Sequence, residues 1–343
     1  MDVTLLERTD PVAAYRGLCV ALHADHGWAS DRHWLRFAAQ AASLRPGAST
    51  DTARDIHAFL EELRRKCGWN DSLQLPFGQM IAAAMVQVGD TPEAFIADLH
   101  AARKLMHSLG LPHSNWYELK AIAALRLMWE GGTVASEPLL NRVAEIYAGL
   151  RNYHWWTTGR HELPACALLS GCPGDPPAII GNAEAVASAV AAEHLVHGHA
   201  LQTVAGILPL AGLPAGAAFR RLEALVAAIS AAGLPKSDET VTVAAMLCLL
   251  DHEPAVIAAR LHDLANQLAD ADHPTFITAD IAVAADLAFL DLLRCDAQGH
   301  RLSTVVDDLR MRRLLRLQRA ISVVIADVPV EPATSDWPLM PFA

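Results

Sequence analysis

Apolar residues recur along most of the chain at the spacing of an α-helix. Two clear stripes are formed by Leu139, Leu140, Val143, Ile146, Tyr147 and Leu150, and by Phe219, Leu222, Leu225, Val226 and Ile229. Such spacing gives each helix one apolar face that packs on a core. Other segments, such as 121–128 and 241–250, are apolar nearly all round, which predicts helices buried between neighbours. The pattern therefore predicts alternating inner and outer helices.

Helix starts and stops are marked by recurring short motifs. A capping side chain followed by proline occurs at Asp10-Pro11, Thr91-Pro92-Glu93 and Ser136-Glu137-Pro138. Proline is well suited to a first helical position because its missing N–H would have no partner there. The motif Gly-Leu-Pro recurs at Gly110-Leu111-Pro112, Gly212-Leu213-Pro214 and Gly233-Leu234-Pro235, where glycine can adopt the left-handed cap conformation.

These marks divide the central part of the chain into helix pairs. The predicted pairs are 73–88 with 92–109, 116–130 with 137–151, 161–171 with 183–195, 199–210 with 217–232, and 238–250 with 254–269, and a sixth begins near 279. The starts 116, 161, 199, 238 and 279 are 45, 38, 39 and 41 residues apart. We therefore predict an all-α protein of stacked antiparallel helix hairpins, an α-solenoid-like array with a period of about 40 residues.

The domain organisation follows from this array. Residues 1–70 form an N-terminal helical cap, with helices expected near 11–25, 31–44 and 52–66, and residues 71–300 form the hairpin array. Residues 301–327 form a C-terminal capping helix around a predicted helix at 303–326, and residues 328–343, which contain four prolines, form an irregular tail.

Composition supports a folded helical chain and argues against nucleic-acid partners. Hydrophobic residues make up 52% of the 343 residues and charged residues 19%, which excludes general disorder. The net charge of -11 opposes binding to a phosphate backbone. The run Arg310, Arg312, Arg313, Arg316 and Arg319 is interpreted as a solvated or docking face, and six scattered cysteines as reduced core residues.

We expect a cytoplasmic protein that does not enter a membrane. The first residues lack the basic and apolar regions of a secretory signal. The longest weakly charged stretch, 200–219, is interrupted by glycines and prolines that a membrane-spanning helix would not favour.

Four segments carry a resemblance to a known family. They are Trp69-Asn70-Asp71-Ser72, Ile146-Tyr147-Ala148-Gly149-Leu150, residues 154–169, and Leu201-Gln202 with Ile207-Leu208. On these residues the chain, from about Trp69 to Leu293, resembles the bacterial family called domain of unknown function 4003. His154, Thr158 and Pro164 fit the family pattern, whereas His161 and Glu162 replace its acidic pair, so a role that needs two carboxylates is not carried over. The resemblance implies an all-helical fold and a special status for the region around His154, and no activity.

The connection at 152–162 is the first candidate site. It is rich in aromatic and imidazole groups, and its candidate ligand-binding residues are His154, Trp155, Trp156, Thr158, His161 and Glu162. Aromatic rings that offer a large contact area, beside histidines that make directional hydrogen bonds, are typical of ligand pockets. The alternative is that Trp155 and Trp156 fill the gap between two hairpins while Thr158 caps a helix.

A second group of histidines follows at His194, His197 and His199. Imidazoles at this spacing bind zinc, iron or copper in some proteins, but histidines at a loop edge more commonly hydrogen-bond or face water. We therefore assign no metal ligands, and the sequence leaves the cofactor unknown.

Stacking predicts that the two histidine groups meet. The turns that precede successive inner helices lie along one edge of a hairpin array, so His113, residues 154–161 and 197–199, Ser237-Asp238 and Thr278-Asp280 should share that edge. His197, His199 and Gln202 therefore join the ligand-binding set, and the alternative is that these residues are separate helix caps.

Two main classes of function remain, beside a regulatory role that involves the basic C-terminal helix. Phosphate loops, HExxH, nucleophile elbows and dinucleotide fingerprints are missing from the sequence. The first hypothesis is a binding protein for a peptide, a protein or a small ligand along the histidine-rich edge. The alternative is an enzyme that uses the same edge on a small-molecule or peptide substrate, with histidines as acid–base groups or metal ligands.

Overall fold

The computed structural model describes residues 10–26, 38, 45, 47–66, 76–129, 132–153, 159–269, 281–293, 295 and 305–326. Within these ranges the chain forms fourteen α-helices, two short 3₁₀ helices and no β-strand, which confirms the all-α class. Of the helix expected near 31–44 only residue 38 is described, and the tail from 328 and the turn at 278–280 lie outside the described residues.

The helices follow the predicted order. They are α1 (Pro11–His26), α3 (Ser49–Lys66), α4 (Pro76–Gln87), α5 (Pro92–Ser108), α6 (Asn115–Met128), α7 (Glu137–Leu150), η3 (Arg160–Glu162), α8 (Leu163–Leu169), α9 (Pro176–Ala192), α10 (Gly198–Ile207), η4 (Leu208–Ala211), α11 (Ala215–Ala231), α12 (Asp238–Leu247), α13 (Pro254–Ala269), α14 (Ile281–Leu292) and α15 (Val305–Ile325). Among the described helices, no single one has the length and apolarity to cross a membrane. The pair Gly198–Ala211 and Ala215–Ala231, bent by 112°, meets those criteria only when the two are taken together.

Side-chain caps explain several helix starts. The hydroxyls of Thr91 and Ser237 accept hydrogen bonds from backbone N–H groups in the first turns of α5 and α12. Ser136 precedes α7 but makes no such bond, so the start of α7 is marked by the proline in its first turn. The predicted start of α9 at residue 183 is wrong, because Asp175 caps a helix that already begins at Pro176.

The three Gly-Leu-Pro motifs end helices as predicted. Their glycines have φ angles of +73° at Gly110, +70° at Gly212 and +91° at Gly233, a region that other residues rarely enter. After α5, the N–H of Gly110 bonds to the carbonyl of His107 and that of Leu111 to the carbonyl of Met106, which satisfies carbonyls at the helix end.

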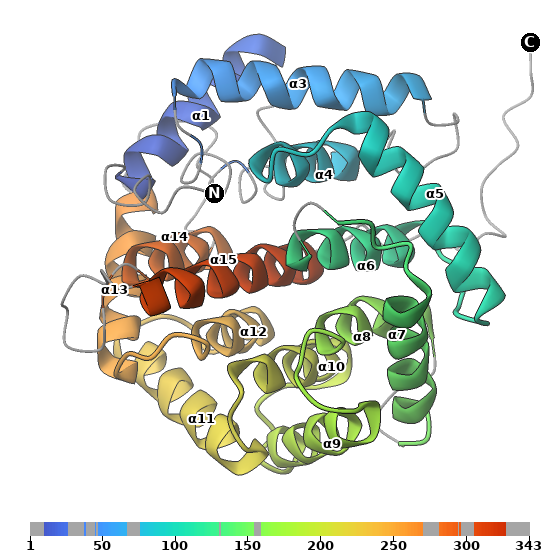
Figure 1. The fold of residues 1–343 in the computed structure, drawn as a ribbon. Helices are drawn as coiled ribbons and strands as arrows, with labels where there is room; N and C mark the ends of the chain where they lie inside the picture. Colours follow the sequence, from blue (N-terminus) through green and yellow to red (C-terminus); the bar gives the residue numbers. More distant parts are fainter. Residues whose placement is uncertain are drawn as a thin grey trace, which may run out of the picture.

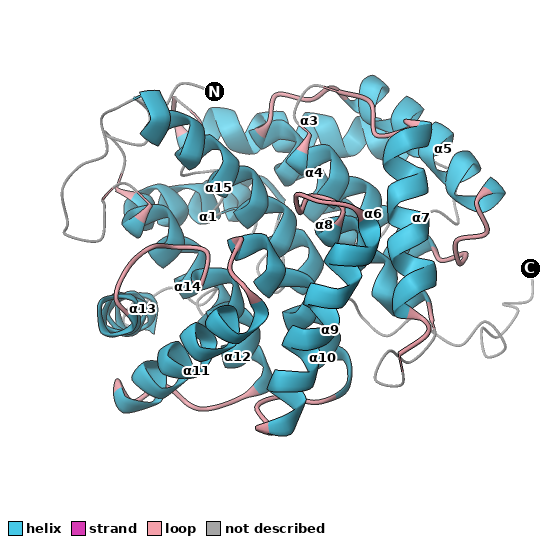
Figure 2. Ribbon diagram, turned by 60° about the horizontal axis from the view of Figure 1, so that its bottom comes forward, coloured by secondary structure: helices cyan, strands magenta, loops and turns pink. Residues whose placement is uncertain are grey.

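The helices form an outer and an inner set, with α15 in the middle (Figures 1 and 2). The outer helices α5, α7, α9, α11 and α13 each pack on the next, and so do the inner helices α6, α8, α10, α12 and α14. Helix α1 contacts both α3 and α14, and the Arg16 side chain donates to the carbonyl of Gln267 in α13, 2.6 Å away. Helices near the two ends of the chain therefore touch.

Arginines on outer helices cap the carboxyl ends of inner helices. Arg142 in α7 donates to the carbonyls of Ser170 (2.9 Å) and Cys172 (2.6 Å), just after α8. Arg221 in α11 donates in the same way to the carbonyls of Cys248 and Leu250, and also to that of His252, just after α12. These cations satisfy carbonyls and offset the negative helix ends.

Helix α15 runs in the opposite direction to the inner helices and ends where they begin. Its last carbonyls, those of Val324 and Ala326, accept hydrogen bonds from the buried Lys120 ammonium in α6. Farther along, Asp286 of α14 accepts from Ser322 (2.6 Å) and Gln318 (3.0 Å), and all three side chains are fully buried. Helix α15 packs most extensively against α6.

Four of the five described cysteines are core residues, as predicted, whereas Cys295 is half-buried. Cys19, Cys166, Cys172 and Cys248 are free and buried. Burial raises the pKa of the Cys19 and Cys248 thiols to about 12, so both stay protonated near neutral pH.

The arginine caps predict that substitutions of two adjacent arginines differ greatly in their effect on stability. Arg221→Met leaves three backbone carbonyls without their charged donor, and we expect it to lower the free energy of unfolding by about 2–3 kcal/mol. Arg220→Met, at the exposed neighbouring position, should stay within about 0.5 kcal/mol of wild type. Urea denaturation measures both variants, and equal losses would contradict a capping role for Arg221.

Candidate functional site

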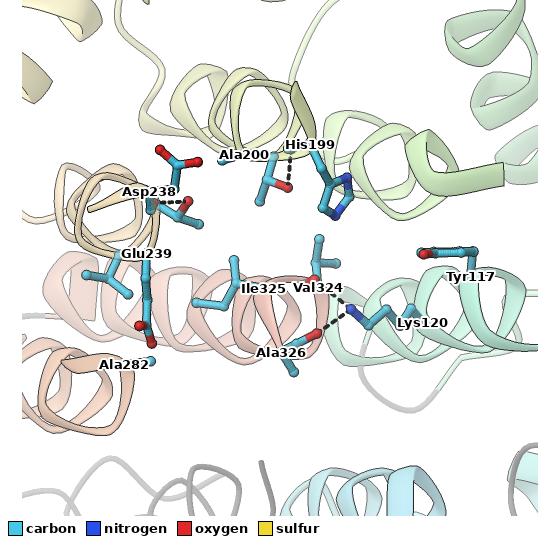
Figure 3. A pocket seen from close by; sticks show the side chains of 13 residues that line it. Tyr117, Lys120, His199, Ala200, Asp238, Glu239, Ala282, Val324, Ile325 and Ala326 are labelled. Atoms are coloured by element: carbon cyan, nitrogen blue, oxygen red, sulfur yellow. Dashed lines mark hydrogen bonds between the residues drawn. The ribbon is translucent and has the colours of Figure 1, made fainter. Parts of the chain in front are cut away.

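The first turns of four inner helices surround a cavity of about 220 Å³ (Figure 3). Helices α6, α10, α12 and α14 contribute their amino-terminal turns, and α15 contributes its carboxyl end. The lining residues are Tyr117, Lys120, His199, Ala200, Thr203, Asp238, Glu239, Thr242, Val243, Ala282, Val324, Ile325 and Ala326. The shared direction of the inner helices thus brings residues more than 100 positions apart to one place.

One side of the cavity is aromatic and basic. Figure 3 shows the His199 ring facing the cavity and the Tyr117 hydroxyl directed toward it, with the Lys120 ammonium nearby. A smaller extension of the cavity adds His161 and Gln202. The rings of Tyr117 and His161 meet edge to face, with centroids 4.4 Å apart, and the rings of His161 and His199 lie 5.9 Å apart.

The opposite side of the cavity is acidic. Asp238 and Glu239 occupy the first turn of α12, directly after the capping residue Ser237. Carboxylates are stabilised there by the positive end of the helix dipole. Figure 3 shows the Glu239 carboxylate beside Ala282 at the start of α14, across the cavity from His199. The walls between the two sides include Ala200, Val243 and Ile325.

Glu162 lies behind the cavity and orients its neighbours. Its side chain is 3% exposed, accepts the Gly159 N–H at 3.0 Å, and accepts the Gln202 amide at 3.3 Å. Burial raises the pKa of Glu162 above the usual value for glutamate, although the hydrogen bonds from the backbone and from Gln202 lower it. Gln202 therefore links a buried carboxyl group to the cavity extension.

The structure places five of the nine predicted ligand-binding residues. His161, His199 and Gln202 border the cavity or its extension, and Glu162 contacts Gln202. His197 precedes α10, is exposed, and does not line the cavity. The other four, His154, Trp155, Trp156 and Thr158, lie outside the described residues.

The histidines at 194–199 point to two different places. The rings of His194 and His197 stack with centroids 5.9 Å apart, while His199 approaches His161 on the cavity side. The main chain turns sharply between them, since His194 and Gly198 have φ angles of +50° and +55°. Sequence spacing alone could not reveal this turn.

Sequence reasoning missed Tyr117 and Lys120. Both occur in the first turns of α6, inside the predicted helix 116–130, but outside the apolar stretch 121–128 that marks this helix in the sequence. A signal was present for Lys120, because a lysine beside a helical stretch that is apolar nearly all round can be buried only if it finds a partner. Its partners, the Val324 and Ala326 carbonyls, lie more than 200 residues away.

The comparison with protein families adds a classification. One family, described as a protein of unknown function (DUF4003), matches residues 78–270, more than half of the chain. The chain belongs to the DUF4003 family. No curated protein and no solved structure matches the chain.

The DUF4003 region supplies the polar part of the cavity. Tyr117, Lys120, His199 and Asp238 all lie within it, whereas Ala282 and the end of α15 lie outside. The cavity is therefore completed by segments that follow the DUF4003 region in the chain.

Close packing of α10 on α8 within the DUF4003 region holds the site together. Gly206 in α10 faces Ala165 in α8, and a Cβ at Gly206 would lie 2.8 Å from the Ala165 Cβ and 3.2 Å from its Cα. Real Cβ atoms do not approach so closely, so the two helices would have to separate. This contact sets the position of Gln202 relative to Glu162.

Two glycine variants test this packing. Gly206→Ala should lower the free energy of unfolding by about 1–3 kcal/mol because it overpacks the α8–α10 contact. Gly181→Ala in α9 has nothing within 4 Å of the new Cβ, and it should raise stability by about 0.5–1 kcal/mol through helix propensity. Urea denaturation of the pair is the measurement, and a stabilising Gly206→Ala would show that the helices are not in contact there.

Proposed function

We propose that the protein binds a small polar molecule in the cavity where α6, α10, α12 and α14 begin. The observation that carries this proposal is the convergence of His199, Lys120 and Asp238, from three helices, on one cavity. Titratable groups of both signs gathered around a cavity with partly apolar walls are the usual composition of a ligand site.

The volume favours a small ligand. Pockets for drug-sized molecules have roughly 300–1,000 Å³, and this cavity has about 220 Å³. A molecule about the size of an amino acid or a monosaccharide suits it better than a folded partner or a long peptide does. The proposal is therefore narrower than the peptide, protein or small ligand expected from sequence.

The distribution of charge favours a ligand with different groups at its two ends. The side formed by Tyr117, His199 and Lys120 offers hydrogen-bond donors to an acceptor such as a carboxylate or carbonyl oxygen. The side formed by Asp238 and Glu239 offers acceptors to an amine or hydroxyl group. A molecule that carries both kinds of group would satisfy both sides at once.

We also propose that the hairpins are degenerate repeats of about 40 residues. The inner helices α10, α12 and α14 begin at residues 198, 238 and 281. The equivalent arginines Arg142 and Arg221 support this proposal, since each reaches from an outer helix to the end of the next inner helix. An array of such hairpins, whose ends meet through α1, would bring the starts of its inner helices together around one centre.

An enzymatic role is the second candidate. It is favoured by the row of Tyr117, His161 and His199, whose rings follow one another beside the cavity extension. Imidazole and phenol groups that reach a bound molecule can pass a proton to or from it. The two candidates differ in outcome, because an enzyme changes its ligand chemically and a binding protein returns it unchanged.

A cavity-filling variant tests the proposed binding. Untagged protein is dialysed against the small-molecule fraction of a bacterial extract, and retained compounds are identified by mass spectrometry. We expect wild type to retain a polar compound and Ala200→Phe to lose it by more than about tenfold, because the new ring occupies the cavity. Continued incubation shows whether the retained compound is converted.

Ala192→Phe is the matched control for this experiment. It introduces the same ring at an exposed position at the end of α9, away from the cavity, and it should retain the compound as wild type does. Circular dichroism and thermal melting confirm that both variants fold. Equal retention by the Ala200→Phe and wild-type proteins, or no retention by wild type, contradicts the proposed site.

A further inference from the structure

The turn between α5 and α6 brings three potential metal ligands together. The left-handed Gly110 reverses the chain after α5, so that His107 in the last turn of α5 and His113 in the connection lie beside Glu118 in α6. One ligand atom from each of the three residues lies within 4.8 Å of the other two. Among the described residues, this is the group of histidine, cysteine and carboxylate side chains that meets such a criterion.

We infer that His107, His113 and Glu118 form a site for a divalent transition metal, with Zn²⁺ as the best-fitting ion. The His107 Nε2 atom is 2.7 Å from the Glu118 Oε1 atom, and the His113 Nδ1 atom is 3.9 Å from it. Ligand atoms around a tetrahedral zinc ion, with bonds of about 2.1 Å, are about 3.4 Å apart. The His107 distance is shorter than this value and the His113 distance is longer. Each pair of atoms would need to shift by about 0.5–0.7 Å to match it.

The surroundings hold the Glu118 carboxylate in place, whereas the exposed His113 ring can change its position. The Glu118 side chain is 3% exposed, and its Oε1 atom also accepts the Ser114 N–H at 3.1 Å. The Arg103 Nε atom lies 3.4 Å from the other oxygen, Oε2. His113 is 74% exposed and sits in a connection, so its ring can move by the required distance and the site is open to ions from solvent.

The donor set selects the class of metal. Two imidazoles and one carboxylate suit zinc and other first-row divalent ions better than Ca²⁺ or Mg²⁺, which prefer oxygen ligands only. Three protein ligands also leave a coordination position open for water or a substrate group.

The inferred site is separate from the central cavity. Glu118 follows Tyr117 in α6 but does not line the cavity, and neither His107 nor His113 does. The inference therefore stands without the proposed function, and a metal bound between His161 and His199 would be a different result.

Zinc titration tests the inference. Isothermal titration of Zn²⁺ into untagged full-length protein should show one saturable site, with a melting temperature that rises with Zn²⁺ because the ion binds the folded state. His107→Ala and His113→Ala should each weaken binding by more than about tenfold. Glu118→Gln keeps an acceptor for the Ser114 N–H, removes the charge, and should weaken binding as well.

Two further histidine variants make the result specific. His100→Ala removes an exposed histidine from the same helix, α5, and should leave zinc binding unchanged. His199→Ala removes a histidine of the central cavity and should also leave it unchanged. The inference is overturned if wild type shows no saturable zinc binding. It is also overturned if binding survives in His107→Ala and His113→Ala or is lost in His199→Ala.

Discussion

The hydrogen bonds from Lys120 to the end of α15 are the interaction on which the site depends. Carbonyls in the last turn of a helix have no partner within the helix, and in a protein interior they need another donor. At the ends of the inner helices α8 and α12, Arg142 and Arg221 supply such donors. Helix α15 runs the other way, so its last carbonyls lie among helix starts, and Lys120 is the donor they receive.

This arrangement explains why the cavity has the composition it has. The hydrogen bonds from Lys120 fix Val324, Ile325 and Ala326 in the lining of the cavity. They also hold the Lys120 ammonium at the edge of the cavity. The first turn of α12 brings acidic groups to the other side, where the helix dipole favours them. The positive and the negative side of the cavity therefore both follow from the directions of the helices. The proposed ligand, which carries an acceptor at one end and an amine or hydroxyl group at the other, follows from these charges.

Local features of the fold could be predicted from sequence because their causes lie within a few residues. Thr91, Ser237 and Gly110 act as caps in the way their motifs indicate, and the missed start at Asp175-Pro176 follows the same rule. The proximity of His161 to His199 was also predicted, because each lies at the start of an inner segment. The central position of α15 and the role of Lys120 depend on contacts between distant segments, which no local pattern encodes. His107 was missed, and His113 was expected only at the histidine-rich edge, because nothing local in the sequence joins the two histidines to Glu118.

Hydrogen exchange measured by mass spectrometry on Lys120→Met tests the central claim most directly. If Lys120 anchors α15, amides in 319–326 and in the first turn of α10 should exchange faster than in wild type, while those of α9 should not change. Lys104→Met, at an exposed position of α5, is the control and should match wild type throughout. Unchanged exchange over 319–326 in Lys120→Met would contradict the account.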